Sequence, residues 1–97
     1  MRVLVTGAAG FIGRHVVNLL DRQGYDVHWF DVVAEDAENR ADITKPLPRI
    51  DGLDAVIHLA AIAAPRECDK DPGRAFDINV NGTLQVLRMA LESGARK

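Results

Sequence analysis

The sequence lacks the features that mark secreted, membrane-spanning or nucleic-acid-binding proteins. Cys68 is the only cysteine among the 97 residues, so no disulfide can form within the chain and a reducing compartment is acceptable. No apolar run approaches the roughly 18 residues of a membrane span, and no basic segment leads into the shorter apolar run of a signal peptide. We therefore expect a cytoplasmic protein.

An excess of positive charge is also absent. The chain has 12 Lys and Arg against 14 Asp and Glu, a formal net charge of −2, whereas a nucleic-acid surface needs clustered Lys and Arg. We expect neither nucleic acid nor a membrane as a partner. The hydrophobic fraction of 47% and the charged fraction of 27% are typical of a globular protein, and the length allows one small domain, residues 1–97.

Short apolar runs alternate with helical patterns along the chain. Runs of strand length occupy residues 2–6, 27–30 and 55–60, with a shorter one ending at 41–43. Helical spacing of apolar residues extends from Phe11 to a glycine cap at Gly24, and again over 72–92. This order predicts a three-layer α/β fold, a Rossmann-type parallel sheet with strand order 3-2-1-4, which is the first half of a doubly wound domain. Most of 34–52 and the segment 63–71 are expected to be loops.

Three glycines separate the first strand from the first helix, in the pattern Gly7-x-x-Gly10-x-x-Gly13. Gly7 lets the chain turn sharply out of the strand, Gly10 lets the backbone approach a pyrophosphate, and Gly13 lets the helix pack close to the sheet. The start of the helix then offers unpaired N–H groups and a partial positive charge to an anion. A plain strand–turn–helix with incidental glycines is the alternative, but the flanking strand and helix favour a phosphate-binding loop.

An acidic residue, Asp31, ends the second strand about 20 residues beyond the glycines, as a dinucleotide-binding fingerprint requires. A carboxylate there accepts hydrogen bonds from the adenosine ribose and repels a 2′-phosphate. Because no Arg or Lys occurs in residues 32–39, the sequence favours NAD over NADP as the cofactor. Arg14 is close enough in sequence to reach a phosphate, so NADP stays the alternative.

These motifs resemble those of the extended short-chain dehydrogenases/reductases, the family of NAD-dependent sugar epimerases and dehydratases. The resemblance rests on Thr6–Gly13, Asp31, Asp42-Ile43, His58–Ala61 and Asn79–Thr83. It implies that the backbone at Phe11 and Ile12 belongs to the phosphate loop and that Asp42 and Ile43 hold the adenine edge. It further implies that the backbone of Leu59, Ala60 and Ala61 lines the cofactor and that Asn79 helps to position it near the nicotinamide.

The catalytic residues of that family have no counterpart in this chain. The family uses a Ser or Thr and a Tyr-x-x-x-Lys, but the only tyrosine, Tyr25, is followed four residues later by Trp29, and the only serine, Ser93, ends a helix. We therefore expect residues 1–97 to be a truncated N-terminal portion of an NAD-dependent sugar-nucleotide epimerase, dehydratase or reductase, inactive alone. A non-catalytic nucleotide-binding module, a fragment of an NADP-dependent reductase and a structural piece without a ligand are the alternatives.

Other polar residues give weaker signals, and the last helix gives a stronger one. We interpret His58 as a packed strand residue, find no metal-ligand spacing at His15 or His28, and expect no metal site. The last helix carries two apolar stripes, of which only one can cover the sheet. We therefore expect self-association through this helix or through the edge of the strand at 55–60. The stripes are Phe76, Val80, Leu84, Leu87 and Leu91 on one side, and Ile78, Val86 and Met89 on the other.

Overall fold

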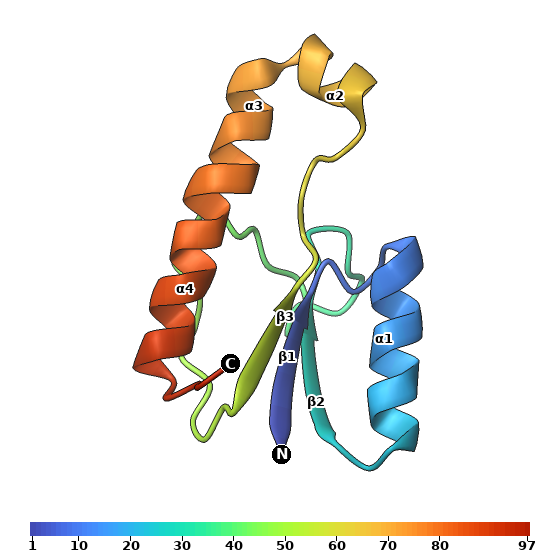
Figure 1. Ribbon diagram of the computed structural model, residues 1–97, viewed down its shortest axis with the longest axis vertical. Coiled ribbons are helices and arrows are strands. Elements are labelled where there is room, and N and C mark those ends of the chain that lie inside the picture. The colour runs from blue at the N-terminus through green and yellow to red at the C-terminus, as the bar shows by residue number, and fades with distance from the viewer.

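A parallel sheet in the order β2-β1-β3 lies at the centre of the computed structural model, which describes all of residues 1–97 (Figure 1). The elements follow one another as β1 (Arg2–Thr6), α1 (Phe11–Arg22), β2 (Asp26–Phe30), β3 (Ala55–His58), α2 (Pro65–Lys70), α3 (Pro72–Phe76), the π-helical turn η1 (Asp77–Gly82) and α4 (Thr83–Glu92).

The first strand, β1, is the middle of the sheet and is buried on both faces. It pairs in parallel with β2 in the register Val3 to Val27, and with β3 in the register Val3 to Ala55. Leu4 and Val5 are fully buried, one on each face, because helices cover both sides of the sheet. This explains why the strand is a continuous apolar run without polar alternation.

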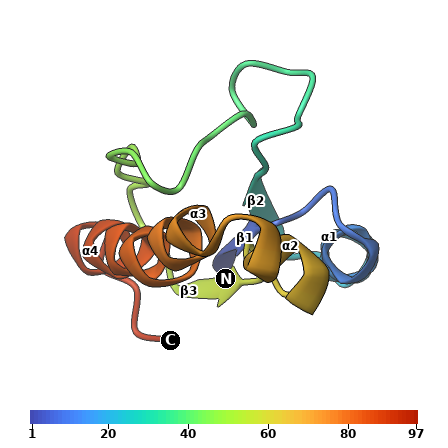
Figure 2. The ribbon, with the colours of Figure 1, turned by 90° about the horizontal axis from the view of Figure 1, so that it is seen from above.

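The helices form two outer layers around the sheet. Figure 2 shows α1 on one face and the rod made by α3, η1 and α4 on the other. The main core lies under α4, where Leu4, Phe30, Leu53 and Met89 pack together. The predicted three-layer parallel α/β fold is therefore confirmed.

The expected outer strand at 41–43 is not a strand, so the predicted order 3-2-1-4 is corrected to three strands. In its place a single parallel bridge joins Asp31 to Arg40, and the Ala41 N–H then donates to the Asp31 carbonyl at 3.3 Å. An Asx turn at Asp42 and the prolines Pro46 and Pro48 then divert the chain, because proline has no N–H for a ladder. The chain crosses instead to α4, where the Ile50 N–H donates to Ser93 Oγ at 2.9 Å.

Two helical predictions also change. The segment 63–71, expected to be a loop, contains α2, which begins with Pro65 at a position where its missing N–H costs nothing. The helix expected over 72–92 is present, but η1 widens it between α3 and α4. Asp71 caps its start by accepting a hydrogen bond from the Arg74 N–H at 3.0 Å.

The outer edge of β3 is partly occupied by the end of the chain. Lys97 O accepts from the Val56 N–H at 2.9 Å, and the Arg96 N–H donates to Asp54 O at 2.9 Å. Backbone groups that an edge strand would leave open are therefore paired here. This favours the last helix over the edge of the 55–60 strand as the surface for the predicted self-association.

Candidate functional site

The turn between β1 and α1 has no room for a side chain at two of its glycines. Gly7 has φ of +69°, and a Cβ there would lie 2.6 Å from the Ala60 nitrogen. A Cβ at Gly13 would lie 2.8 Å from the Cα of Ala8 and would overlap the carbonyl of Gly7. The first turn of α1 is therefore packed directly against the end of β1 and the segment after β3.

The start of α1 is left open to receive an anion. Gly10 is its N-cap, no side chain caps it, and its first turn carries no acidic residue. The first N–H groups, at Phe11, Ile12 and Gly13, therefore have no partner within the helix and add to the positive end of its dipole. A Cβ at Gly10 would meet only the Gly7 carbonyl, at 3.3 Å, a tight contact that a small shift of this carbonyl would relieve.

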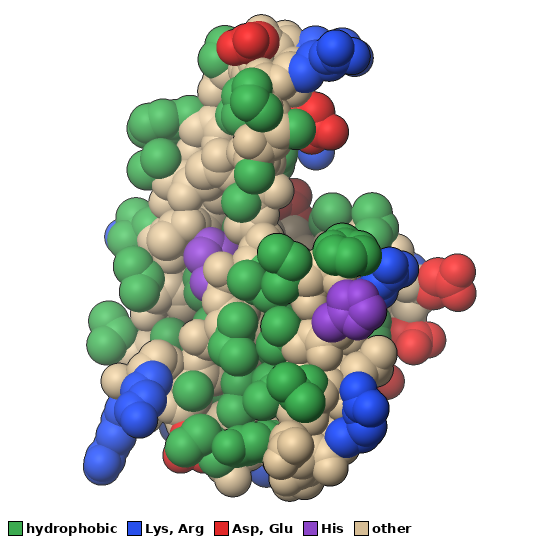
Figure 3. Space-filling view, turned by 45° about the vertical axis from the view of Figure 1, so that its right-hand side comes forward, with side chains coloured by type: hydrophobic (Ala, Val, Ile, Leu, Met, Phe, Trp, Pro, Cys, Tyr) green, Lys and Arg blue, Asp and Glu red, His purple; other side chains and the backbone are tan.

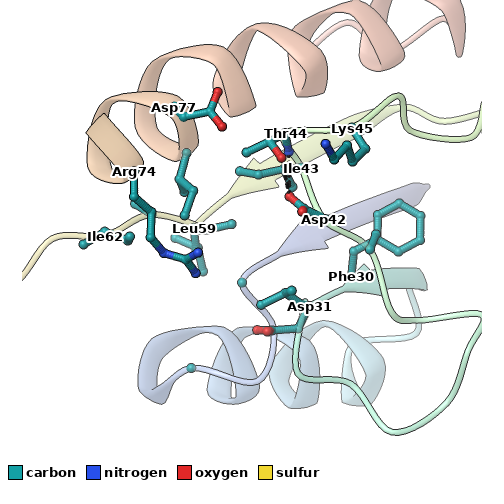
Figure 4. Close-up of a pocket in the computed structure, with 17 residues that line it drawn as sticks. Phe30, Asp31, Asp42, Ile43, Thr44, Lys45, Leu59, Ile62, Arg74 and Asp77 are labelled. Atoms are coloured by element: carbon teal, nitrogen blue, oxygen red, sulfur yellow. Dashed lines mark hydrogen bonds between the residues drawn. The ribbon is translucent and has the colours of Figure 1, made fainter. Parts of the chain in front are cut away.

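A cleft of about 480 Å³ lies at the carboxyl ends of the three strands (Figure 4). This is where open parallel α/β sheets bind their ligands. Eight of the residues predicted from the sequence line it: Gly7, Gly10, Asp31, Asp42, Ile43, Leu59, Ala60 and Ala61. Four predicted residues do not line it: Phe11, Ile12, Gly13 and Asn79. Those that the sequence did not single out are Phe30, Val32, Ala41, Thr44, Lys45, Ile62, Arg74, Asp77 and Ile78.

The carboxylate of Asp31 connects the end of β2 to the glycine turn. Its Oδ2 accepts from the Ala9 N–H at 2.9 Å, and its Oδ1 accepts from the Val33 N–H at 3.1 Å. Each oxygen keeps a lone pair for a further donor, such as a hydroxyl of a ligand. Arg40, the first cation in the following loop, is occupied because its guanidinium donates to the carbonyls of Ala34 and Glu35, at 2.8 and 2.5 Å.

Asp42 and Ile43 form the opposite wall. Asp42 Oδ1 accepts from both the N–H and the hydroxyl of Thr44, at 2.9 and 2.7 Å, and these bonds hold the pKa of this carboxyl below its usual value. The positive charges of Lys45 and Arg74 act in the same direction. The side chain of Ile43 is buried against Gly82, where a Cβ would lie 2.6 Å from Ile43 Cδ1. Ile43 thus lines the cleft while its side chain is held against the rod.

Asn79 acts on the cleft through the backbone of Ile62. Its Oδ1 accepts from the Ile62 N–H, and its Nδ2 donates to the Ile62 carbonyl, both at 2.8 Å. Because both polar atoms of the amide are used in this pair, Asn79 fixes the segment that follows β3. The expected role of Asn79, to help position a cofactor near the nicotinamide, stays a prediction.

The buried hydroxyl of Thr6 and the half-buried side chains of His58 and Thr83 join β1, β3 and the helical rod. Thr83 Oγ1 donates to the Asn79 carbonyl at 2.6 Å, so it accepts from His58 Nε2 at 3.0 Å. His58 Nδ1 then accepts from Thr6 Oγ1 at 2.6 Å, and Thr6 Oγ1 itself accepts from the N–H groups of Leu59 and Ala60, at 3.1 and 3.2 Å. Every donor in this network faces an acceptor only if His58 is neutral with its proton on Nε2.

The chain matches the model of the NAD dependent epimerase/dehydratase family over residues 3–97. It is 33% identical to UDP-glucuronic acid decarboxylase 3 of Arabidopsis thaliana over 111 residues, which cover 99% of this chain and 32% of that protein. The UDP-glucose-4-epimerase of Stenotrophomonas maltophila, solved with bound NAD and formylated UDP-arabinopyranose, superimposes with a TM-score of 0.84 at 32% identity, covering 99% of this chain and 35% of that one. The UDP-glucose 4-epimerase of Thermus thermophilus in complex with NAD superimposes with a TM-score of 0.79 at 32% identity. The match covers 97% of this chain and 35% of that one.

The chain therefore belongs to the NAD-dependent epimerase/dehydratase family, which confirms the family resemblance. It spans about a third of the length of the relatives that it matches. The cofactor expected from the sequence, NAD, is the one in the family's description and the one bound in both of these structures. No helix of this structure is long and apolar enough to cross a membrane. The cytoplasmic location stays a prediction.

We predict that acid weakens the fold through His58. Partial burial lowers the pKa of this imidazole below its ordinary 6.5, and protonation would put a second N–H against the Thr6 hydroxyl. Between the folded pKa and 6.5 the unfolded chain binds the extra proton. This contribution to stability is therefore complete above pH 6.5 and is lost as the pH falls through the folded value. Urea unfolding of the wild type and of His58→Gln between pH 7.5 and 5 should show a shallower pH dependence in the variant, and equal slopes would contradict the prediction.

Proposed function

We propose that residues 1–97 form a nucleotide-binding half-domain that holds the adenosine diphosphate portion of NAD. One observation carries the proposal: the uncapped start of α1 and the carboxylate of Asp31 meet at the same cleft at the carboxyl end of the sheet. The start of the helix suits a diphosphate, and the carboxylate of Asp31 suits the hydroxyls of a ribose. Members of the same family that superimpose on 97% or more of this chain contain NAD, which supports the assignment.

The proposed roles follow the walls of the cleft, except that Phe11 to Gly13 do not line it themselves and come directly after the lining residue Gly10. The N–H groups of Phe11 to Gly13 bind the pyrophosphate, with Gly7 and Gly10 keeping its approach free of side chains. Asp31 accepts from the adenosine ribose. Asp42 and the backbone of Ile43 receive the adenine edge, while the backbone from Leu59 to Ala61, held in place by Asn79, lies along the cofactor.

We also propose that this portion binds the cofactor without completing a reaction on its own. NAD supplies a hydride acceptor when it is bound, but the cleft presents no serine, tyrosine or histidine among its lining residues. His58, which comes directly before the lining residue Leu59, is engaged on both nitrogens by Thr6 and Thr83. The whole protein would act on a nucleotide sugar or a similar alcohol, as the names of its relatives suggest.

Gly10→Val should abolish NAD binding without unfolding the chain. Gly10 has φ −72° and ψ 173°, which suit any residue, and its Cβ would require only the Gly7 carbonyl, 3.3 Å away, to move by a few tenths of an ångström. The valine would instead fill the space above the open N–H groups. Calorimetry should show NAD binding to the wild type, and binding at least about 100-fold weaker to the variant, since several charge-assisted hydrogen bonds are lost. Equal affinities for NAD, with circular dichroism showing both proteins folded, would refute the phosphate-loop assignment.

Asp31→Asn should weaken NAD binding and narrow the preference for NAD over NADP. The variant loses a charged acceptor for the ribose, worth about 10-fold or more in affinity, and also the repulsion of a 2′-phosphate. Asp36→Asn is the matched control, because Asp36 is an exposed acid of the next loop that does not line the cleft. If NADP binds the wild type better than NAD, the choice of cofactor is wrong.

We propose further that the outer face of the rod associates with a second copy of the chain. Five apolar side chains run along it with exposed fractions between 44% and 77%: Phe76, Val80, Leu84, Leu87 and Leu91. Figure 3 shows apolar side chains following the length of this rod at the left edge of the molecule. The opposite stripe is used internally, since Val86 and Met89 are buried. A contiguous exposed apolar patch of this kind favours an interface.

Sedimentation velocity over a range of concentrations tests this association. The wild type should sediment as a dimer at high concentration, and Leu87→Lys should raise the dissociation constant at least about 10-fold. Leu19→Lys is the matched control, because Leu19 is a comparably exposed leucine on α1, across the sheet. A wild type that stays monomeric at millimolar concentration, or equal effects of the two variants, would contradict the proposal.

A further inference from the structure

Arg74 is a cation that the fold directs into the cleft without giving it a partner. It lines the same cleft as Gly7 and Gly10, although it lies far from them in sequence. Its backbone N–H is fixed by Asp71 at 3.0 Å, but its guanidinium makes no hydrogen bond or ion pair within the chain. A guanidinium carries five N–H donors, so a cleft-facing one without acceptors is suited to an external anion.

The carboxylates that line the cleft form no ion pair with this guanidinium, although its charge helps to lower the pKa of Asp42. Asp77 lies three residues further along the rod, and Figure 4 shows its side chain pointing away from that of Arg74. The Oδ1 of Asp42 is bonded twice by Thr44, and both oxygens of Asp31 accept backbone N–H groups. None of these carboxylates forms an ion pair with Arg74, although all of them line the cleft.

The direction of the side chain relates it to the glycine turn. Figure 4 shows Arg74 descending from α3 beside Leu59, with its guanidinium over the floor of the cleft. Gly10, the N-cap of α1, lines the same cleft, and the open N–H groups of the helix follow it in sequence. A diphosphate between them would meet the partial charge of a helix end on one side and a full charge on the other, and guanidinium binds phosphate oxygens in a bidentate manner.

We infer that Arg74 is a ligand of the cofactor's diphosphate and closes the cleft opposite the glycine turn. The inference rests on the proposed NAD-binding function and adds to it a specific residue from the helical rod. The binding site then consists of the segments that follow the three strands together with α3, which carries Arg74.

The test compares NAD, ADP, adenosine and NADP as ligands in calorimetry of the full chain. Arg74→Gln should bind NAD and ADP about 10-fold more weakly than the wild type and should bind adenosine equally well, because adenosine has no phosphate. The affinity of the wild type for ADP should also fall more steeply with salt than that of the variant. Arg66→Gln is the matched control: it removes the same charge from an exposed arginine of α2 that does not line the cleft, and it should leave all affinities unchanged.

Each other outcome has a distinct meaning. A wild type that binds none of the four ligands overturns the proposed function itself. A wild type that binds NAD with the same affinity as Arg74→Gln leaves that function standing and overturns this inference. Equal losses in both arginine variants show a general charge effect, a loss for adenosine shows a role for Arg74 in the fold or the adenine pocket, and a loss for NADP alone shows contact with the 2′-phosphate. Each of these three results also overturns the diphosphate assignment.

Discussion

The site depends on a close contact between three pieces of backbone: the turn after β1, the first turn of α1 and the segment after β3. Without side chains at Gly7 and Gly13, these pieces approach to distances that a Cβ would forbid. This contact sets the direction in which α1 leaves the sheet, and so it sets where the open N–H groups of the helix point. An alanine at either glycine would move the helix away from the end of β1 before it met any ligand.

Polar groups secure the remaining walls at positions where an apolar contact would leave the backbone free to shift. Thr6 holds the N–H groups of Leu59 and Ala60, and His58 connects Thr6 to Thr83 on the rod. Asn79 adds the pair of bonds to Ile62. No buried side-chain polar atom lacks a partner, so this network gives direction to the segment after β3 without leaving an uncompensated buried group.

The sequence predicted the parts of the molecule that are set by local chemistry. The glycine spacing and the acid at the end of β2 marked the turn and Asp31, because turn geometry and strand ends are readable from neighbouring residues. The strand expected at 41–43 could not be predicted correctly from the sequence. Whether this segment pairs with β2 or turns toward the rod depends on where Ile43 and Ile50 pack. Gly82 carried a signal in the Asn-Gly-Thr motif, but only the packing of Ile43 shows what that glycine is for. Arg74 carried no such signal, because nothing in the sequence around it indicates that its helix faces the turn after β1.

The helical rod has two occupied sides, and this has a thermodynamic consequence. Its inner side carries Arg74, Asp77 and Ile78 to the cleft and packs Gly82 against Ile43, while its outer side presents the apolar stripe. Binding free energies at two sites on one body are linked reciprocally. If a bound nucleotide changes the affinity of the outer side for a second molecule by some factor, that molecule changes the affinity for the nucleotide by the same factor.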